Sequence, residues 1–315
     1  MLLKDFISRS RTALEALYPA SEAASIVSIL CEDKLGFSKL QHILEPLCEI
    51  PAAREAELAS DIGRLCSGEP LQYVLGHADF YGHRYSVSPA VLIPRPETEL
   101  LVHEAIAQIR RMDRPYGHAP RVLDLCTGSG CIAWSVAAEL PVSEVCAVDI
   151  SDEALAVASS QAVCQNHPNF VKADVLSDNF PGFFSKSASS AGLRVPSSYD
   201  VLLSNPPYVR DSERSQMRKN VLEHEPELAL FVSDGDPLVF YRALAKIASV
   251  MLAPSYGFDL VSCSTPLDPP SPFGIVEINE AFGPEVESLF REAGFRNVRT
   301  IVDFSGKSRH VFFQR

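Results

Sequence analysis

The chain of 315 residues is acidic, with a formal net charge of −12 and a sequence pI of about 5.2, and 46% of its residues are hydrophobic. This composition suffices for one large core and a second small one, and it argues against binding of duplex nucleic acid through a broad basic face. No apolar run has the length of a membrane span, the N-terminus lacks a signal-peptide pattern and the eight cysteines form no C-x-x-C pair, so we expect a cytoplasmic protein without a metal.

Residues 1–75 have the pattern of a small helical bundle. Ser21 and Gly36 are placed to begin and end one helix, and Pro51 is placed to open another. Apolar residues recur at helical spacings of three and four along this region, namely Leu14, Leu17, Ile26, Leu30, Leu40, Ile43, Leu44 and Leu47. We therefore expect residues 1–75 to form a helical domain.

Residues 76–94 are predicted to form a β-hairpin that links the bundle to the rest of the chain. Apolar and polar residues alternate over Asp79–Val87 and Ala90–Ile93, and Ser88-Pro89 lies between these stretches as a turn. The third predicted domain, residues 95–315, follows directly after this hairpin.

The third domain begins with a predicted helix over residues 96–112. Pro96 suits the first helical position, because the N–H that it lacks would have no partner inside the helix. Acidic residues in the first turn and two arginines in the last turn both complement the helix dipole. Strands and helices alternate from there to the end of the chain.

The next segment reads as strand, glycine turn and helix. Arg121–Leu125 is a short apolar strand, Cys126–Gly130 is the turn, and Cys131–Ala138 has helical spacing. A second strand, Glu144–Asp149, ends in a carboxylate 19 positions after Gly130, a reach at which an acid can accept both ribose hydroxyls of a nucleoside. The third glycine of the dinucleotide fingerprint is missing, which argues against an NAD-dependent oxidoreductase.

The remaining pattern predicts a doubly wound, mostly parallel sheet. Further strands are expected over residues 169–174, 200–204, 274–278, 298–302 and 310–313, and helices near 151–165, 237–252 and 283–294. No helix separates the last two strands, so they should form an antiparallel hairpin. Residues 184–198, which are rich in Ser and Ala, and residues 253–273, which are rich in Pro and Ser, read as mobile surface insertions.

The tetrapeptide Asn205-Pro206-Pro207-Tyr208 follows the apolar strand at 200–204, where open α/β sheets place their chemistry. Two prolines stiffen the backbone, so the Asn205 carboxamide oxygen and the neighbouring carbonyl could each accept one N–H of a planar –NH2 group. The Tyr208 ring would then cover that group from the side. A proline-rich turn without a ligand is the alternative reading of these four residues.

Taken together, Asp124–Gly130, Val148–Ile150 and the tetrapeptide resemble class I S-adenosylmethionine-dependent methyltransferases that act on amino groups. Gly68–Tyr73 and Leu92–Glu99 narrow the resemblance to the HemK/PrmC family, which methylates the side-chain amide nitrogen (N5) of the glutamine in the Gly-Gly-Gln loop of class-1 peptide chain release factors. The resemblance implies an α/β fold with a Rossmann-like doubly wound sheet, a C-terminal antiparallel hairpin and a small N-terminal helical bundle that binds the release factor.

The resemblance also implies the roles of individual residues. S-adenosylmethionine would be contacted by Cys126, Thr127, Gly128, Ser129, Gly130, Asp149, Asp174, Val175 and Asn205. The catalytic segment would be Asn205, Pro206, Pro207 and Tyr208, with the substrate amide held by Asn205 and Pro206. Arg95 and Thr98 lie in a segment that the family brings toward the cofactor. Cys126 and Asn279 stand where the family usually has glycines.

Other functions share parts of this pattern. A glutamine methyltransferase of a ribosomal protein would carry the same tetrapeptide. An adenine-N6 methyltransferase would too, and Arg210, Arg214, Arg218 and Lys219 follow it, but the net charge opposes nucleic-acid binding. A non-catalytic adaptor built on the bundle would not need Asn205, Asp149 and the glycine turn together. We expect a monomer that methylates protein and needs no general base.

Overall fold

The structure, a computed structural model, describes residues 1–112, 118–253 and 271–315. These residues form two compact units, Met1–Ala78 with Met217–Glu225 and Asp79–Gln216 with Pro226–Arg315. The insertion predicted over residues 253–273 lies mostly outside the described residues. No helix in the described ranges combines the length and the apolar character needed to cross a membrane.

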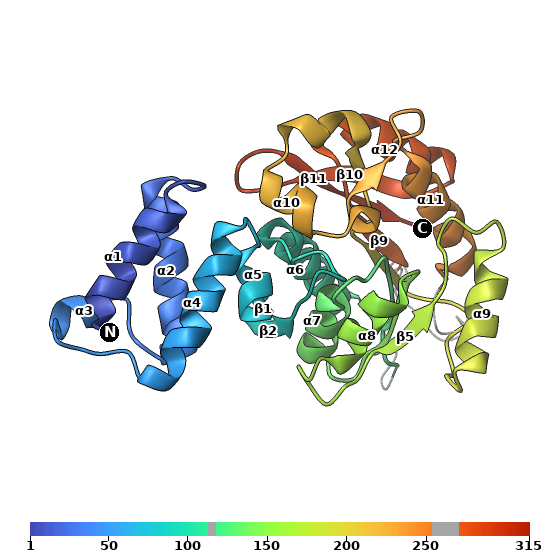
Figure 1. Cartoon of the computed structure of the whole chain (residues 1–315). Coiled ribbons are helices and arrows are strands. Elements are labelled where there is room, and N and C mark those ends of the chain that lie inside the picture. Colours follow the sequence, from blue (N-terminus) through green and yellow to red (C-terminus); the bar gives the residue numbers. More distant parts are fainter. Residues whose placement is uncertain (113–117, 254–270) are drawn as a thin grey trace. The chain divides into compact units, whose positions relative to one another are not determined.

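The first unit is helical, as predicted. Gly36, with φ of +69°, ends one of its helices, and Pro51 directly precedes another. Ser21 is the second residue of its helix, which begins one residue earlier, after Pro19. The helices, shown in Figure 1, are α1 (Leu3–Leu14), α2 (Ala20–Leu35), α3 (Gln41–Leu44), α4 (Ala52–Cys66), α5 (Leu71–Leu75) and α10 (Lys219–His224).

The core of the first unit uses only part of the apolar pattern. Leu14, Ile26 and Leu30 are buried against Leu58 and Leu65 of α4. The later members of the pattern are exposed, and they lie in and beside α3, which is a single turn: Leu40, Ile43, Leu44 and Leu47. Helical spacing therefore does not place these four side chains in the core.

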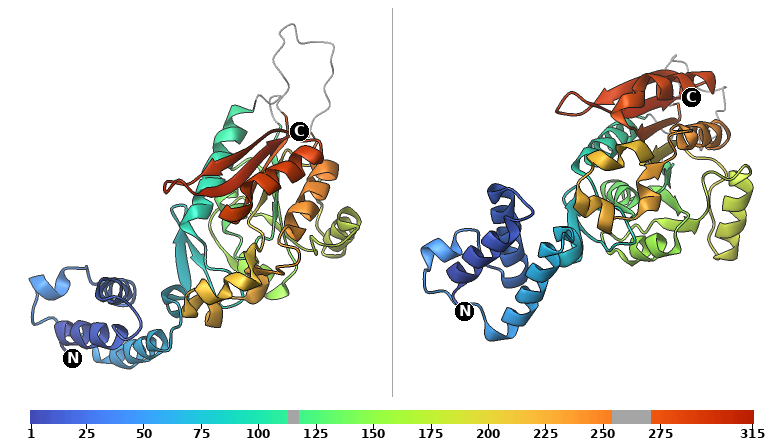
Figure 2. Two further views of the ribbon diagram at one scale, coloured as in Figure 1. Left: turned by 90° about the horizontal axis from the view of Figure 1, so that it is seen from above. Right: turned by 45° about the horizontal axis from the view of Figure 1, so that its top comes forward.

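A seven-stranded sheet, counted over the described residues, forms the centre of the second unit in the order β10-β11-β9-β6-β3-β4-β5. From β9 to β5 the strands are parallel, whereas β11 is antiparallel to both β9 and β10. This confirms the predicted doubly wound sheet with its C-terminal hairpin, drawn in red in Figure 2. The strands are β3 (Arg121–Leu125), β4 (Glu144–Asp149), β5 (Asn169–Lys172), β6 (Val201–Ser204), β9 (Phe273–Glu277), β10 (Arg296–Val302) and β11 (Ser308–Gln314).

Alternate residues of each strand point to opposite faces of the sheet, and helices cover both faces. In β3, Val122 belongs to a core with α6 (Pro96–Arg111) and α7 (Cys131–Glu139). Its neighbour Leu123 belongs to the core on the other face, with α9 (Phe180–Ser190), α11 (Val239–Met251) and α12 (Gly283–Glu292). Shorter elements complete the unit: β7 (Val209–Arg210), a 3-10 turn η1 (Asp211–Gln216), η2 (Glu227–Ala229), β8 (Phe231–Val232) and η3 (Glu280–Phe282).

The predicted hairpin exists, but its turn lies elsewhere. The paired strands are β1 (His77–Phe80) and β2 (His83–Ser86), and they are joined at Tyr81 and Gly82, whose φ angles are +49° and +75°. Two consecutive residues with positive φ match the twist of a tight hairpin, which the Ser88-Pro89 pair does not provide. Residues 90–93 are not a strand.

Two further predictions are wrong in the second unit. Residues 184–198 are not a mobile insertion, because α9 covers their first half and buries Phe184 and Ala188 completely. Their spacing from Phe180 by multiples of four gives one apolar helix face, which the Ser/Ala-rich composition conceals. The helix predicted near 151–165 is shorter, since α8 spans Asp152–Ser160 and the Gln161 carboxamide bonds to the backbone N–H and C=O of Ser86, each at 2.9 Å.

Candidate active site

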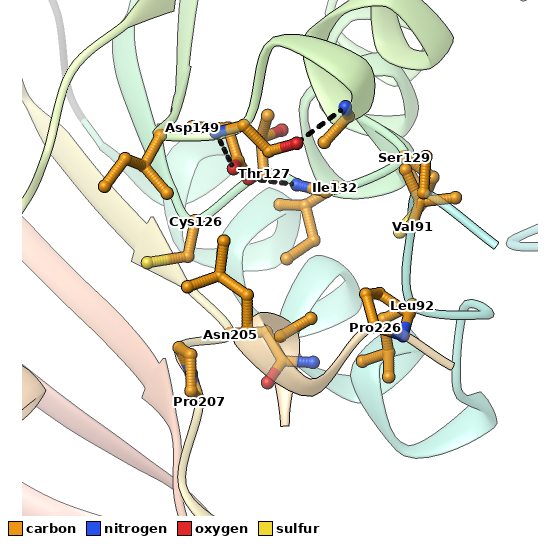
Figure 3. A pocket seen from close by; sticks show the side chains of 18 of the residues that line it. Val91, Leu92, Cys126, Thr127, Ser129, Ile132, Asp149, Asn205, Pro207 and Pro226 are labelled. Atoms are coloured by element: carbon orange, nitrogen blue, oxygen red, sulfur yellow. Dashed lines mark hydrogen bonds between the residues drawn. The ribbon is translucent and has the colours of Figure 1, made fainter. Parts of the chain in front are cut away.

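A cavity of about 330 Å³ lies at the carboxyl ends of four neighbouring parallel strands of the second unit. Its walls come from residues 126–129 after β3, 149–151 after β4, 173–176 after β5, and Asn205 and Pro207 after β6. Figure 3 shows Cys126, Asp149 and Asn205 around this space. Open α/β sheets bind their ligands at this edge, and the predicted residues meet there because parallel strands end together.

The glycine turn depends on unusual backbone angles at Cys126, Gly128 and Gly130, whose φ values are +61°, +54° and +79°. A Cβ on Gly130 would lie 3.1 Å from both the Ala158 Cβ and the Trp134 ring, so the close packing of α7 requires glycine there. A Cβ on Gly128, which lines the cavity, would meet nothing within 4 Å and would enter the ligand's space. Cys126 adopts the left-handed conformation that glycine would adopt at lower cost.

Asp149 presents a fixed carboxylate at the cavity wall. Its Oδ2 accepts the backbone N–H of Gly128 at 2.9 Å and its Oδ1 accepts that of Ser151 at 3.0 Å. Burial raises the pKa of Asp149, which these two hydrogen bonds partly offset. Each oxygen retains acceptor capacity, so the pair can receive two vicinal hydroxyl groups of a ribose.

The neighbouring wall can hold a flat, apolar group. Ala173 and Val175 are buried beside the cavity, and Phe240 also lines it. The Asp174 carboxylate accepts the backbone N–H of Leu176 at 2.9 Å, which holds the loop after β5 in place. Apolar side chains next to the Asp149 carboxylate give this wall a polarity that suits a nucleoside.

Asn205 also lines the cavity, and its carboxamide is held by a hydrogen bond to a neighbouring side chain. Its Nδ2 donates to the Thr98 hydroxyl at 3.2 Å, and that hydroxyl donates to Glu277 at 2.7 Å. Tyr208 does not line the cavity, because its hydroxyl donates to the other oxygen of Glu277 at 2.9 Å. Burial and the adjacent Glu277 carboxylate raise the pKa of Tyr208.

The structure brings most of the sequence-predicted site residues to this cavity. Gly130, Pro206 and Tyr208 do not line it. Those that do are Cys126, Thr127, Gly128, Ser129, Asp149, Asp174, Val175, Asn205 and Pro207. Pro206 is buried, and Gly130 acts through the packing of α7.

Two parts of the site were not predicted in full. The sequence placed Arg95 in a segment near the cofactor but predicted residues 90–93 as a strand, whereas residues 89–92, 94 and 95 line the cavity together with Pro226, Leu228 and Ala229. Glu277 is buried at the end of β9, and a lone acid within the apolar run at 274–278 was the available signal for it.

Asn279 occupies the other position at which the family usually has glycine. Its φ is −65°, so no glycine is needed there. Its carboxamide donates to the Tyr208 carbonyl at 3.2 Å and to Glu213 at 3.0 Å. The substitution therefore adds a bond that holds the end of the tetrapeptide.

The chain matches known proteins over nearly all its length. A family model described as the PrmC N-terminal domain matches residues 5–76, and one described as the methyltransferase small domain matches residues 105–239. The release factor glutamine methyltransferase of Bacteroides thetaiotaomicron is 38% identical over 301 residues, covering 95% of each chain. Proteins of the same name from Flavobacterium psychrophilum (31% identical, 99% of this chain and 98% of that one) and Streptococcus pneumoniae (34%, 94% of each) are also similar.

Proposed function

The chain belongs to the release factor glutamine methyltransferase family, and from this premise we propose that it methylates the side-chain amide nitrogen of the glutamine in the Gly-Gly-Gln loop of class-1 peptide chain release factors. It is an S-adenosylmethionine-dependent enzyme. The observation that carries the proposal is the Asn205 carboxamide, held at the wall of the cavity that Asp149 also lines. Because release factors act in translation, we place the enzyme in the cytoplasm.

The residues around the cavity fit the cofactor. S-adenosylmethionine supplies, when bound, a sulfonium-linked methyl group as the electrophile. Asp149 would accept the ribose hydroxyls, the apolar wall at 173–176 would flank the adenine, and the turn at 126–129 would surround the methionine part. The open space beside Gly128 is available to that part because no side chain fills it.

Asn205 would supply the specificity for an amide nitrogen. The lone pair of a carboxamide nitrogen is delocalised, so the enzyme must orient the –NH2 group and stabilise the positive charge that grows on it during methylation. The Asn205 oxygen, at the cavity wall, would accept one N–H; the sequence assigned the other to the carbonyl of Pro206, a buried residue that does not line the cavity. A hydrogen bond to Asn205 strengthens as the N–H becomes more acidic, which favours the transition state over the ground state.

The cations that follow the tetrapeptide favour a protein substrate over a nucleic acid. Arg210 pairs with Glu213, Arg214 with Asp211 and Glu227, Arg218 with Glu22, and Lys219 with Glu223. A carboxylate beside each cation cancels much of its attraction for phosphate groups. Incubation with labelled cofactor followed by mass spectrometry of release factor, ribosomal protein and DNA separates the possible substrates, and a methyl group on the Gly-Gly-Gln glutamine is the expected result.

Replacing the acceptor tests the role of Asn205. We expect Asn205→Ala to lower kcat on release factor by roughly 10² or more and to change the Kd for S-adenosylmethionine by less than about threefold, because the group acts on the substrate amide. Turnover is measured by methyl transfer and affinity by calorimetry. Asn297→Gly is the matched control, since it removes an exposed carboxamide at φ of +48°, a conformation that glycine accepts. Unchanged turnover in the Asn205→Ala variant would contradict the role.

We also propose that the helical first unit binds the release factor away from the site of methyl transfer. The PrmC N-terminal domain match covers residues 5–76 of this unit. Four apolar side chains within residues 40–47 support a binding surface there, because they are 54–79% exposed: Leu40, Ile43, Leu44 and Leu47. Exposed apolar residues gathered in one segment are typical of interaction sites. With such a second contact, the enzyme would prefer a glutamine within an intact release factor to free glutamine.

A further inference from the structure

A chain of hydrogen bonds connects Asn205 to a buried carboxylate on β9. The Asn205 Nδ2 donates to the Thr98 Oγ1 at 3.2 Å, and the Thr98 Oγ1 donates to the Glu277 Oε2 at 2.7 Å. Thr98 is 2% exposed and Glu277 is 1% exposed, so water does not compete for the bond between them, whereas the bond from Asn205 lies at the cavity wall and is partly buried. The three residues come from α6, β9 and the loop after β6.

The direction of each bond follows from the chemistry of the groups. A hydroxyl has one hydrogen, and Thr98 gives it to Glu277, because a carboxylate can only accept. The Thr98 oxygen then has only lone pairs to offer to Asn205. The carboxamide must therefore turn its –NH2 toward Thr98, which leaves the Asn205 oxygen as the group directed away from Thr98.

We propose that Thr98 and Glu277 are positioning residues that hold the Asn205 carboxamide in the orientation that accepts a substrate N–H, an inference that rests on the proposed function. The opposite orientation would place the –NH2 of Asn205 against the –NH2 of the substrate glutamine, donor against donor. It would also set the Asn205 oxygen against the Thr98 lone pairs. Both unfavourable contacts disfavour the opposite orientation of the carboxamide, since an unpaired buried polar group is costly.

Glu277 is itself held from several sides. The Tyr208 hydroxyl donates to its Oε1 at 2.9 Å, and the Tyr241 hydroxyl donates to its backbone carbonyl at 3.2 Å. The buried His310 ring, its partner across the β9–β11 ladder, lies with Nε2 3.6 Å from the Glu277 Oε2. The carboxylate that fixes the Thr98 hydroxyl is thus fixed in turn, as positioning a reactive group requires.

The test compares two replacements of Thr98. Thr98→Val keeps the shape of the side chain and removes the hydroxyl, so we expect kcat on release factor to fall by about tenfold, with the Kd for S-adenosylmethionine unchanged within about twofold. Thr98→Ser keeps the hydroxyl and should retain at least about a third of wild-type kcat. If Thr98→Val does not fold, as judged by thermal unfolding, Thr98→Ala replaces it. Equal loss in the Ser and Val variants would overturn the proposal.

A double-mutant comparison separates positioning from a general structural effect. If Thr98 acts only through Asn205, Thr98→Val will cause no further loss of kcat in an Asn205→Ala background. A further tenfold loss there would overturn the proposal. Independently of activity, the side-chain amide protons of Asn205 should exchange more slowly with solvent in wild type and Thr98→Ser than in Thr98→Val, as followed by NMR. An inactive wild-type protein would refute the proposed function, whereas an active wild type with unaffected variants would refute this inference alone.

Discussion

At position 126 the backbone has φ of +61°, a conformation that costs an ordinary L residue about 1–2 kcal/mol. The turn keeps this angle because Gly128 donates to Asp149 and Thr127 donates its backbone N–H to the Val148 carbonyl at 2.9 Å. Contacts with the neighbouring strand β4 therefore compensate for the unfavourable backbone angle at Cys126. Burial also raises the pKa of the Cys126 thiol, so the side chain stays a neutral part of the cavity wall.

Asp124 provides a prediction about pH. It is fully buried below the glycine turn, burial raises its pKa to about 7, and the Thr127 hydroxyl, which donates to it at 2.6 Å, opposes this only in part. Its pKa is higher in the folded than in the unfolded protein, so the folded state keeps a proton that the unfolded state loses. The free energy of unfolding should fall by up to about 4 kcal/mol between pH 4 and pH 7 through this group.

Replacing Asp124 by asparagine should abolish that contribution. Urea unfolding at pH 5, 6, 7 and 8 should show the Asp124→Asn variant gaining stability relative to wild type as pH rises toward 8. Asp178→Asn is the control, because the Asp178 side chain is fully exposed and should leave the pH dependence unchanged. A wild-type and variant difference that is constant over this range would contradict the assignment.

Among the elements, the pairing of β9 with β11 depends on one glycine. A Cβ on Gly274 would lie 2.2 Å from the ring of Phe313, which is fully buried and stacks on Phe290 with ring centroids 3.9 Å apart. The ring has no room to move away. Gly274 thus allows the antiparallel strand β11 to pair directly beside β9, the strand that also carries Glu277.

We predict that Gly274→Ala lowers the free energy of unfolding by about 1–3 kcal/mol, the range expected for an overpacked core. Chemical denaturation measures it. Gly63→Ala is the matched control, since a Cβ there, inside α4, meets nothing within 4 Å and should raise stability by about 1 kcal/mol through helix propensity. Equal effects of the two substitutions would show that the space above Gly274 is not limiting.

In the molecule as a whole, the chain passes from the first unit to the second, returns to the first for a short segment and then completes the second. Residues 217–225 belong to the helical unit, although they follow the tetrapeptide at 205–208 and precede Pro226, which lines the cavity. The sequence predicted a single boundary at residue 75 and not this return, because α10 spans only six residues and its sequence does not indicate that it packs with the first unit. The chain on both sides of this segment contributes to the site.

The proposed binding surface on the first unit gives a prediction at this scale. Leu44→Asp with Leu47→Asp should raise KM for full-length release factor by about tenfold and leave kcat unchanged, because the lost contact contributes equally to ground and transition states. Methylation of a short Gly-Gly-Gln peptide should not change. Val142→Asp is the control, since Val142 is 76% exposed and lies just before β4, at the amino ends of the strands, whereas the cavity lies at their carboxyl ends. Equal losses on peptide and protein would argue against a separate docking surface.

The sequence predicted the fold class, the parallel strands and the convergence of Cys126, Asp149 and Asn205. These depend on local patterns, namely apolar runs, a glycine turn and polar residues where strands end. It misplaced the hairpin turn and concealed α9, because positive φ at Tyr81 and a buried face within a Ser/Ala-rich segment follow from packing.

The orientation of Asn205 could not be predicted from the sequence. Thr98 is 107 residues from Asn205 and 179 from Glu277 along the chain, and no local pattern links positions so far apart. The hydrogen bonds form because α6, β9 and the loop after β6 pack side by side. A buried polar group must find a partner, and the fold determines which one it finds.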